Sequence, residues 1–190
     1  SLPRIYRDVL IFQISLVYIF AGIAKINYDW LILGMPLKIW LPANSSLPII
    51  GNVLSYNTTA YIFSWFGMIY DLTIPFFLLY GKSRLIGFVA VVIFHSITGI
   101  LFQIGVFPLI MTVMATFFFS SELHRKSLNT LFHYFNKSTA IKHTISTNII
   151  NNDYVPRYKI ILFTIVALFQ LFFPLRPLMS SGKMFWTEAG

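Results

Sequence analysis

Residues 11–26 read IFQISLVYIFAGIAKI, an apolar run in which the one charged residue, Lys25, stands near the end. A charge inside or at the rim of a bilayer is costly unless it snorkels, is paired or serves a function. By position alone, Lys25 is either a functional residue or a lysine whose ammonium reaches the headgroups. Asp29, four residues on, is a possible ion-pair partner. The stretch therefore predicts a membrane helix with a candidate functional residue, Lys25, near its end.

The composition is that of a membrane protein. Hydrophobic residues make up 57% of the 190 and charged residues only 11%, and mean hydropathy is +0.74. Five segments are predicted to enter the membrane, where backbone groups must bond internally and so form helices. These segments are residues 9–26, 60–80, 85–103, 106–119 and 158–175. The predicted fold class is all-α, a polytopic integral membrane helical bundle with about five transmembrane or membrane-embedded helices.

The basic residues that give the net charge of +8 are distributed as a membrane topology signal, which argues against a nucleic-acid partner. All but four of the 14 cations fall on one side of the predicted spans, and no nucleic-acid-reading motif accompanies them. The four exceptions are Lys25, Lys38, Arg176 and Lys183. This pattern predicts a cytoplasmic N-terminus, a cytoplasmic loop over residues 120–156 and an exoplasmic Lys25 end. Membrane lipids are the expected surroundings, with no nucleic acid.

Two more polar residues lie inside predicted spans. Asp71 interrupts IFSWFGMIYDLTIPFFLLY about halfway along the second span, where an unpaired carboxylate needs a partner or becomes neutral. His95 lies at a similar depth on the third span, so the two side chains are predicted to come within reach. Each is either a hydrogen-bonded core residue or a catalytic one. The chain has no cysteine and no second histidine near His95, so no metal site is expected.

The second span and the connection before it carry further patterns. Small or polar residues recur at helical spacing along residues 60–75, as a stripe suited to close helix packing. The stripe consists of Ala60, Ser64, Gly67, Asp71 and Pro75. The connection over residues 32–59 is rich in proline, asparagine and serine, which form turns and loops. It is expected to be an outer connection that folds over the mouth of the bundle.

Several blocks in order resemble one family over most of residues 10–126. They are QISLVYIFAGIAKINYDWL, GMPLKIWL, YIFSWFGMIYDLTIPFFLL, FHSITGILFQIGVFP and ATFFFSSELHR, with FWTEAG near the end. The chain resembles the vitamin K-dependent gamma-carboxylases and their bacterial relatives with the horizontally transferred transmembrane (HTTM) domain. GMPLKIWL is closer to the bacterial branch. The family has further helices before the lysine helix and an extramembrane region after the WTE segment. Residues 1–190 are therefore expected to be a partial HTTM-like domain.

The resemblance implies an enzyme that couples oxygenation of a hydroquinone to carboxylation of glutamate in a protein substrate. Vitamin K hydroquinone or a related quinol is the implied cofactor, with O2 and CO2 as co-substrates and no metal. In the family, the lysine matching Lys25 is regarded as the base that takes a hydroquinone proton. Asp71 and His95 match supporting residues of the catalytic site. Candidates to line a quinone slot are Tyr18, Gly22, Trp30 and Phe102.

Two other functions stay open at this point. One is a noncatalytic membrane module that binds a lipid or quinone or supports a fused partner. The other is a small transporter or channel that uses Asp71 and His95 in a proton path. The enzyme requires a lysine amine, held in a dry site, that accepts a proton.

Overall fold

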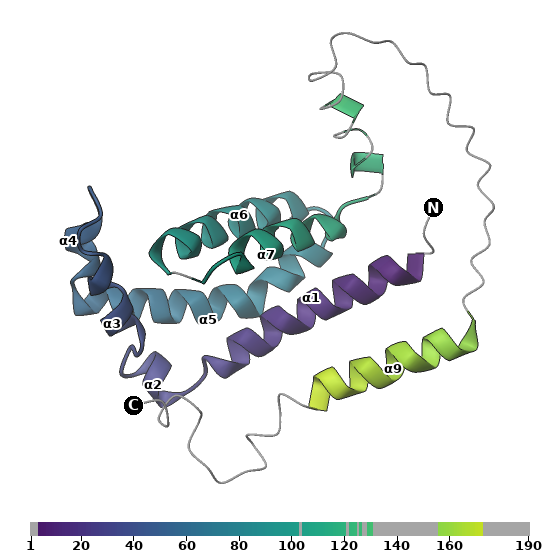
Figure 1. The fold of residues 1–190 in the computed structure, drawn as a ribbon, viewed down its shortest axis with the longest axis horizontal. Helices are drawn as coiled ribbons and strands as arrows, with labels where there is room; N and C mark the ends of the chain where they lie inside the picture. The colour runs from purple at the N-terminus through teal and green to yellow at the C-terminus, as the bar shows by residue number, and fades with distance from the viewer. Residues whose placement is uncertain are drawn as a thin grey trace.

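The computed structural model describes residues 4–102, 104–120, 122–124, 126, 129–130 and 156–172. Within these ranges every regular element is a helix, and three helices are long and apolar enough to cross a membrane. They are α1 (Arg4–Ala24), α5 (Asn57–Leu79) and α6 (Arg84–Leu101). Two shorter apolar helices are α7 (Phe107–Ala115), continued by the 3-10 turn η2 (Thr116–Phe118), and α9 (Arg157–Phe172). The predicted all-α, membrane-type fold is confirmed (Figure 1).

Each of the five segments predicted to enter the membrane overlaps one of these helices. The fourth is the shortest, as expected, since α7 has nine residues before the chain tightens into η2. Helix α9 has 16 residues, fewer than the roughly 20 that a spanning helix needs. Most of the loop predicted over residues 120–156 lies outside the described residues. Which helices cross the bilayer, and in which direction, stays a prediction.

Helix α5 lies at the centre of the bundle, with α1 packed on one side of it and α6 on the other (Figure 1). Helix α7 packs on α6, and η2 reaches back to α1. Helix α9 runs beside α1, where Lys159 Nζ donates a hydrogen bond of 3.1 Å to the Tyr6 hydroxyl. The main core comprises Ile14, Tyr18, Tyr70, Ile74, Leu78, Val91, Met111, Ala115 and Phe118.

Helices α1 and α5 are strongly offset along their axes. The end of α1 reaches only the middle of α5, because Gly22 lies against Leu72 and Lys25 pairs with Asp71. Asp71 stands 14 residues after the first residue of α5, Asn57, which is about 21 Å along the helix. More than half of α5 therefore extends beyond α1 at this end, and Lys25 is not at the rim of the bundle.

Four short helical elements cover that outer half of α5. They are α2 (Tyr28–Leu31), α3 (Leu37–Trp40), η1 (Pro42–Asn44) and α4 (Gly51–Leu54). Helix α2 starts because the Asn27 side chain accepts a hydrogen bond from the Trp30 backbone N–H. A second apolar cluster unites this region and comprises Trp30, Leu37, Leu41, Leu54, Ala60 and Leu101. The connection over residues 32–59 does fold onto the bundle, but as packed helical turns rather than as loop alone.

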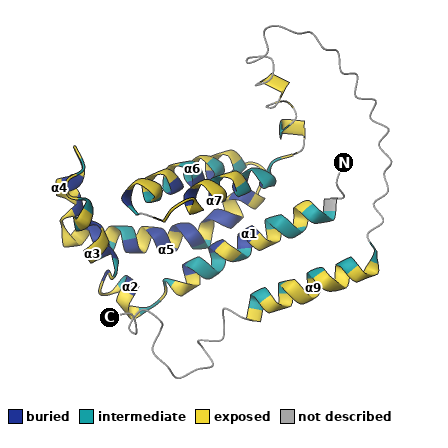
Figure 2. Cartoon of the chain, viewed as in Figure 1, coloured by how far each residue is buried: buried dark blue, intermediate teal, exposed yellow. Residues whose placement is uncertain are grey.

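The predicted stripe on α5 is buried along its whole length, and Figure 2 shows buried residues recurring along this helix. By contrast, α9 has no buried residue. Many large apolar side chains point outward from α5 and α6, among them Ile69 and Ile86, exposed by 52% and 65%. Such outward apolar surface suits a lipid environment and would be unfavourable in water.

The tight contact at Gly22 yields a test of the helix offset. A Cβ on Gly22 would lie 2.6 Å from Leu72 Cγ and 3.1 Å from the Leu72 backbone nitrogen. Gly22→Val should therefore push α1 from α5 and lower the free energy of unfolding by about 1–3 kcal/mol. Thermal unfolding in detergent, followed by circular dichroism, measures the loss. Gly81→Val is the control, because a Cβ there meets no atom within 4 Å; equal midpoints for both variants would contradict the packing.

Candidate functional site

Lys25 and Asp71 form an ion pair inside the bundle. Lys25 Nζ lies 2.6 Å from Asp71 Oδ2, and the two side chains are 21% and 7% exposed. The Lys25 nitrogen also donates to the Ala21 carbonyl at 3.2 Å and lies 5.3 Å from the Trp30 ring centroid. A carboxylate halfway along a membrane helix needs such a partner, since leaving it charged and alone is costly. The pair explains how α5 tolerates Asp71.

This pairing differs from the one considered from sequence. Asp29, the nearest acidic residue in the chain, is exposed on α2, and Lys25 bonds to Asp71 instead. Helix α1 ends at Ala24, so the one-turn spacing that would bring Asp29 to Lys25 on a continuous helix does not apply.

A second polar contact joins α1 to α6. The Tyr18 hydroxyl lies 3.0 Å from His95 Nε2, and the two residues are 2% and 4% exposed. His95 therefore bonds to Tyr18 and not, as its depth allowed, directly to Asp71. Tyr18 lies in α1 and Lys25 directly follows the last residue of that helix. The two are seven residues apart, or two helical turns, which places them on the same side, about 10 Å apart along the axis. Two polar contacts thus lie at successive depths on the same side of the helix.

Both contacts border one cavity of about 660 Å3 between α1, α5, α6 and α7. Its size is typical of small-molecule sites, which are mostly apolar with a few polar groups. Apart from Lys25, Asp71, His95 and Thr98, its walls are apolar or aromatic. The aromatic lining residues are Tyr18, Trp30, Trp40, Phe63, Phe66, Tyr70, Phe94, Phe102 and Phe107. Within this lining, the Tyr70 and Phe94 rings stack with centroids 3.9 Å apart.

Six of the seven residues expected at the site line this cavity: Lys25, Asp71, His95, Tyr18, Trp30 and Phe102. Trp30 is anchored there, because its indole N–H donates to the Ser64 carbonyl at 3.0 Å. Gly22 is the exception, since it lies against Leu72 and is not part of the lining. Sequence reasoning did not assign Gly67 and Tyr70 to the site. Gly67 stands one turn before Asp71, so helical spacing gave a signal for it.

The cavity has an apolar rim. Its lining includes Ile62 and Phe66 of α5 and Ile93 of α6, which are 61%, 57% and 54% exposed. In a bilayer these side chains face acyl chains rather than water. An apolar ligand would therefore reach the cavity most easily from the membrane.

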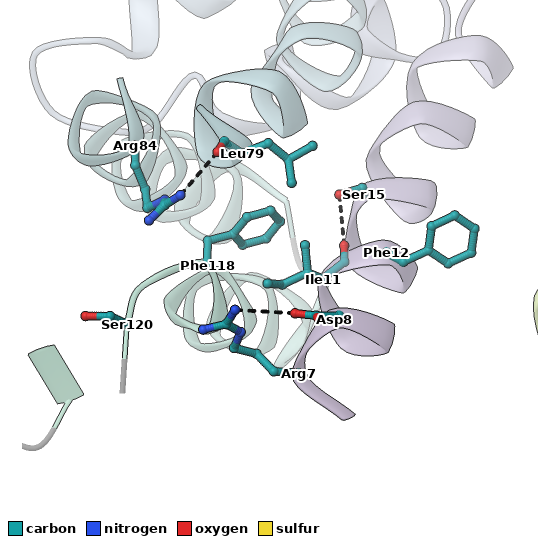
Figure 3. Close-up of a pocket in the computed structure, with 9 residues that line it drawn as sticks. All are labelled: Arg7, Asp8, Ile11, Phe12, Ser15, Leu79, Arg84, Phe118 and Ser120. Carbon is teal, nitrogen blue, oxygen red and sulfur yellow. Dashed lines mark hydrogen bonds and ion pairs between the residues drawn. The ribbon is translucent and has the colours of Figure 1, made fainter. Parts of the chain in front are cut away.

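A second pocket, of about 500 Å3, lies at the opposite end of α1 (Figure 3). Its two arginines already have structural partners. Arg84 donates to the carbonyls of Leu78 and Leu79 and so caps the end of α5, while Arg7 lies 3.4 Å from Asp8 at the exposed surface. Arg7 and Arg84 thus lie at the same end of the bundle.

These features define a helical membrane-type protein with a charged pair buried beside an aromatic cavity. A family model described as "HTTM domain" matches residues 1–122, which include every residue that lines the cavity. The chain belongs to the HTTM-domain family, and this part of the resemblance is confirmed. No solved structure matches the chain.

The buried pair predicts a characteristic coupling between two substitutions. Lys25→Met alone leaves a buried carboxylate unpaired, whereas Lys25→Met with Asp71→Leu removes both charges together. We expect the double variant to be more stable than the sum of the single effects predicts, by about 0.5–3 kcal/mol. A double-mutant cycle of unfolding free energies in detergent measures this coupling. Strict additivity would show that the two groups do not interact.

Proposed function

We propose that the cavity binds a hydroquinone of the vitamin K type and that the chain belongs to a gamma-carboxylase-like enzyme. In that enzyme, hydroquinone epoxidation with O2 would be coupled to carboxylation of glutamate side chains with CO2. The proposal rests on one observation, the Lys25–Asp71 pair in the wall of an aromatic cavity. Membership of the HTTM-domain family supports it.

The lining suits this class of ligand. Flat aromatic rings pack well on the faces and edges of other rings, which Trp30, Phe66 and Phe102 offer. A hydroxyl on such a ring requires one polar partner, and the Lys25–Asp71 pair provides both a donor and an acceptor. When bound, a hydroquinone would supply the reducing equivalents for oxygen and the strong base needed at glutamate.

The Lys25–Asp71 pair can act as a single proton acceptor. Before a hydroxyl approaches, the pair holds one shared proton, either as ammonium with carboxylate or as amine with carboxylic acid. Uptake of one further proton leads from both forms to the same state, ammonium with carboxylic acid. Proton uptake is thus a property of the coupled pair rather than of one atom. Lys25 need not be uncharged by itself, because Asp71 can take the incoming proton.

The surroundings support this role. Burial excludes water, which would otherwise compete for the proton and for reactive species. The indole of Trp30 lies over the Lys25 nitrogen, and Tyr18 with His95 forms a second polar wall deeper along α1. We assign Tyr18, His95, Trp30 and Phe102 to holding the ring and Lys25 with Asp71 to moving the proton.

The partners and orientation belong to the same proposal. A glutamate-containing protein is the proposed second substrate, bound by parts of a longer protein, and membrane lipids surround the bundle. We place the N-terminus in the cytoplasm, because Arg7 and Arg84 lie together at that end. The end bearing Lys25 and the short helices α2 to α4 then faces the exoplasmic side.

A noncatalytic module that only binds a quinone or lipid is the second candidate. The exposed apolar rim at Ile62, Phe66 and Ile93 favours it, because such a rim serves binding from the bilayer without any chemistry. Ligand binding without oxygen consumption would be its signature.

Oxygen uptake tests the enzymatic proposal. Adding reduced vitamin K to the detergent-solubilised full-length protein should start oxygen consumption. Lys25→Met with Asp71→Leu should slow it by about 100-fold or more, since the proton acceptor is gone. Lys38→Met is the matched control, because Lys38 bonds to the Tyr61 hydroxyl at 2.7 Å and does not line the cavity.

Two results would overturn the proposal in different ways. Full oxygen uptake by the double variant would remove the pair from the mechanism. Absence of uptake in the unsubstituted protein, with quinone binding intact, would select the noncatalytic module.

A further inference from the structure

Gly67 combines burial with empty space. It lies in the middle of α5 on the buried stripe, yet a Cβ built on it would meet no atom within 4 Å. Gly67 also lines the cavity, one helical turn before Asp71. The space that its missing side chain leaves therefore belongs to the cavity.

Packing does not account for a glycine at this position. Glycine inside a helix is destabilising relative to alanine, and membrane helices usually gain close backbone contact in return. Gly22 and Gly87 follow that rule, with Cβ positions 2.6 Å from Leu72 Cγ and 3.0 Å from Phe77 Cβ. Gly67 has no such neighbour. The remaining explanation for a glycine at position 67 is the space that it leaves in the cavity.

The Trp30 indole and the Lys25–Asp71 pair show where the space beside Gly67 lies. Ser64 and Asp71 lie on the same face of α5. The Ser64 backbone carbonyl accepts the hydrogen bond from the Trp30 indole, and the Asp71 carboxylate pairs with Lys25. Gly67 stands between them at helical spacing, three residues after Ser64 and four before Asp71. The open wall thus lies on the cavity side of α5, one helical turn from the charged pair, where a ligand presenting a hydroxyl to the pair would place its ring.

We infer that Gly67 determines which ring systems the cavity accepts: its bare backbone admits a fused two-ring quinol, and a side chain there would restrict the site to one ring. This inference rests on the proposed function and specifies its substrate class. A larger residue at position 67 would project into the space for the second ring and leave the rest of the cavity open.

Binding of two quinones of different width tests the inference. The probes are 2-methyl-1,4-naphthoquinone and trimethyl-1,4-benzoquinone, measured by quenching of tryptophan fluorescence, since Trp30 and Trp40 line the cavity. The chain has no cysteine, so the quinones cannot modify a thiol. Gly67→Leu should weaken naphthoquinone binding by about tenfold or more, which is typical of an overfilled site, and benzoquinone binding by less than about threefold.

Gly81→Leu is the matched control, because position 81 is equally open but lies away from the cavity. It should leave binding of both probes unchanged. Gly67→Ala should raise the thermal unfolding midpoint, because alanine favours the helix and meets no neighbour. A lowered midpoint in Gly67→Ala would reveal a packing role and overturn the inference.

Other outcomes separate this inference from the proposed function. Equal loss of both probes in Gly67→Leu, unchanged binding of both, or no binding to the unsubstituted protein would each overturn it. Selective loss of the naphthoquinone in a protein that consumes no oxygen would uphold the role of Gly67 and refute only the enzymatic activity.

Discussion

The attraction between Lys25 and Asp71 governs the arrangement of the bundle. A carboxylate in the middle of α5 requires a cation at its own depth, and the end of α1 supplies it at 2.6 Å. That requirement fixes α1 and α5 in their offset positions, with Gly22 allowing the backbones to approach. The outer part of α5, left without α1, is then covered by α2, α3 and α4. Of these short helices, α2 and α3 contribute residues to the cavity wall.

Glycine has two opposite roles in this bundle, close helix packing in one place and open space in another. At Gly22 the missing side chain brings two helices together, and at Gly67 it keeps a wall open beside the charged pair. Both belong to α1 and α5, whose contact positions the proton acceptor. Close packing and open space are therefore arranged within a few residues of the same ion pair, beside a cavity of about 660 Å3.

Much of the fold could be predicted from sequence, because hydropathy and length directly report membrane-type helices. The importance of Lys25, Asp71 and His95 was also predictable, since a polar group inside such a helix requires a reason. The hydrogen-bond and ion-pair partners of these residues could not be predicted. Lys25 bonds to Asp71, 46 residues away, because α1 ends at Ala24 and Asn27 starts a new helix that carries Asp29 outward. Nor can composition distinguish Gly22, which packs, from Gly67, which lines the cavity; only the neighbouring atoms decide.

The absorption spectrum of a naphthohydroquinone bound without oxygen tests the central claim most directly. Bulk pH is set where the free compound keeps both protons. The account predicts the spectrum of the deprotonated compound when it is bound to the unsubstituted protein, and of the protonated compound when it is bound to Lys25→Met with Asp71→Leu. A protonated spectrum in the unsubstituted protein would contradict the claim that this pair accepts the proton.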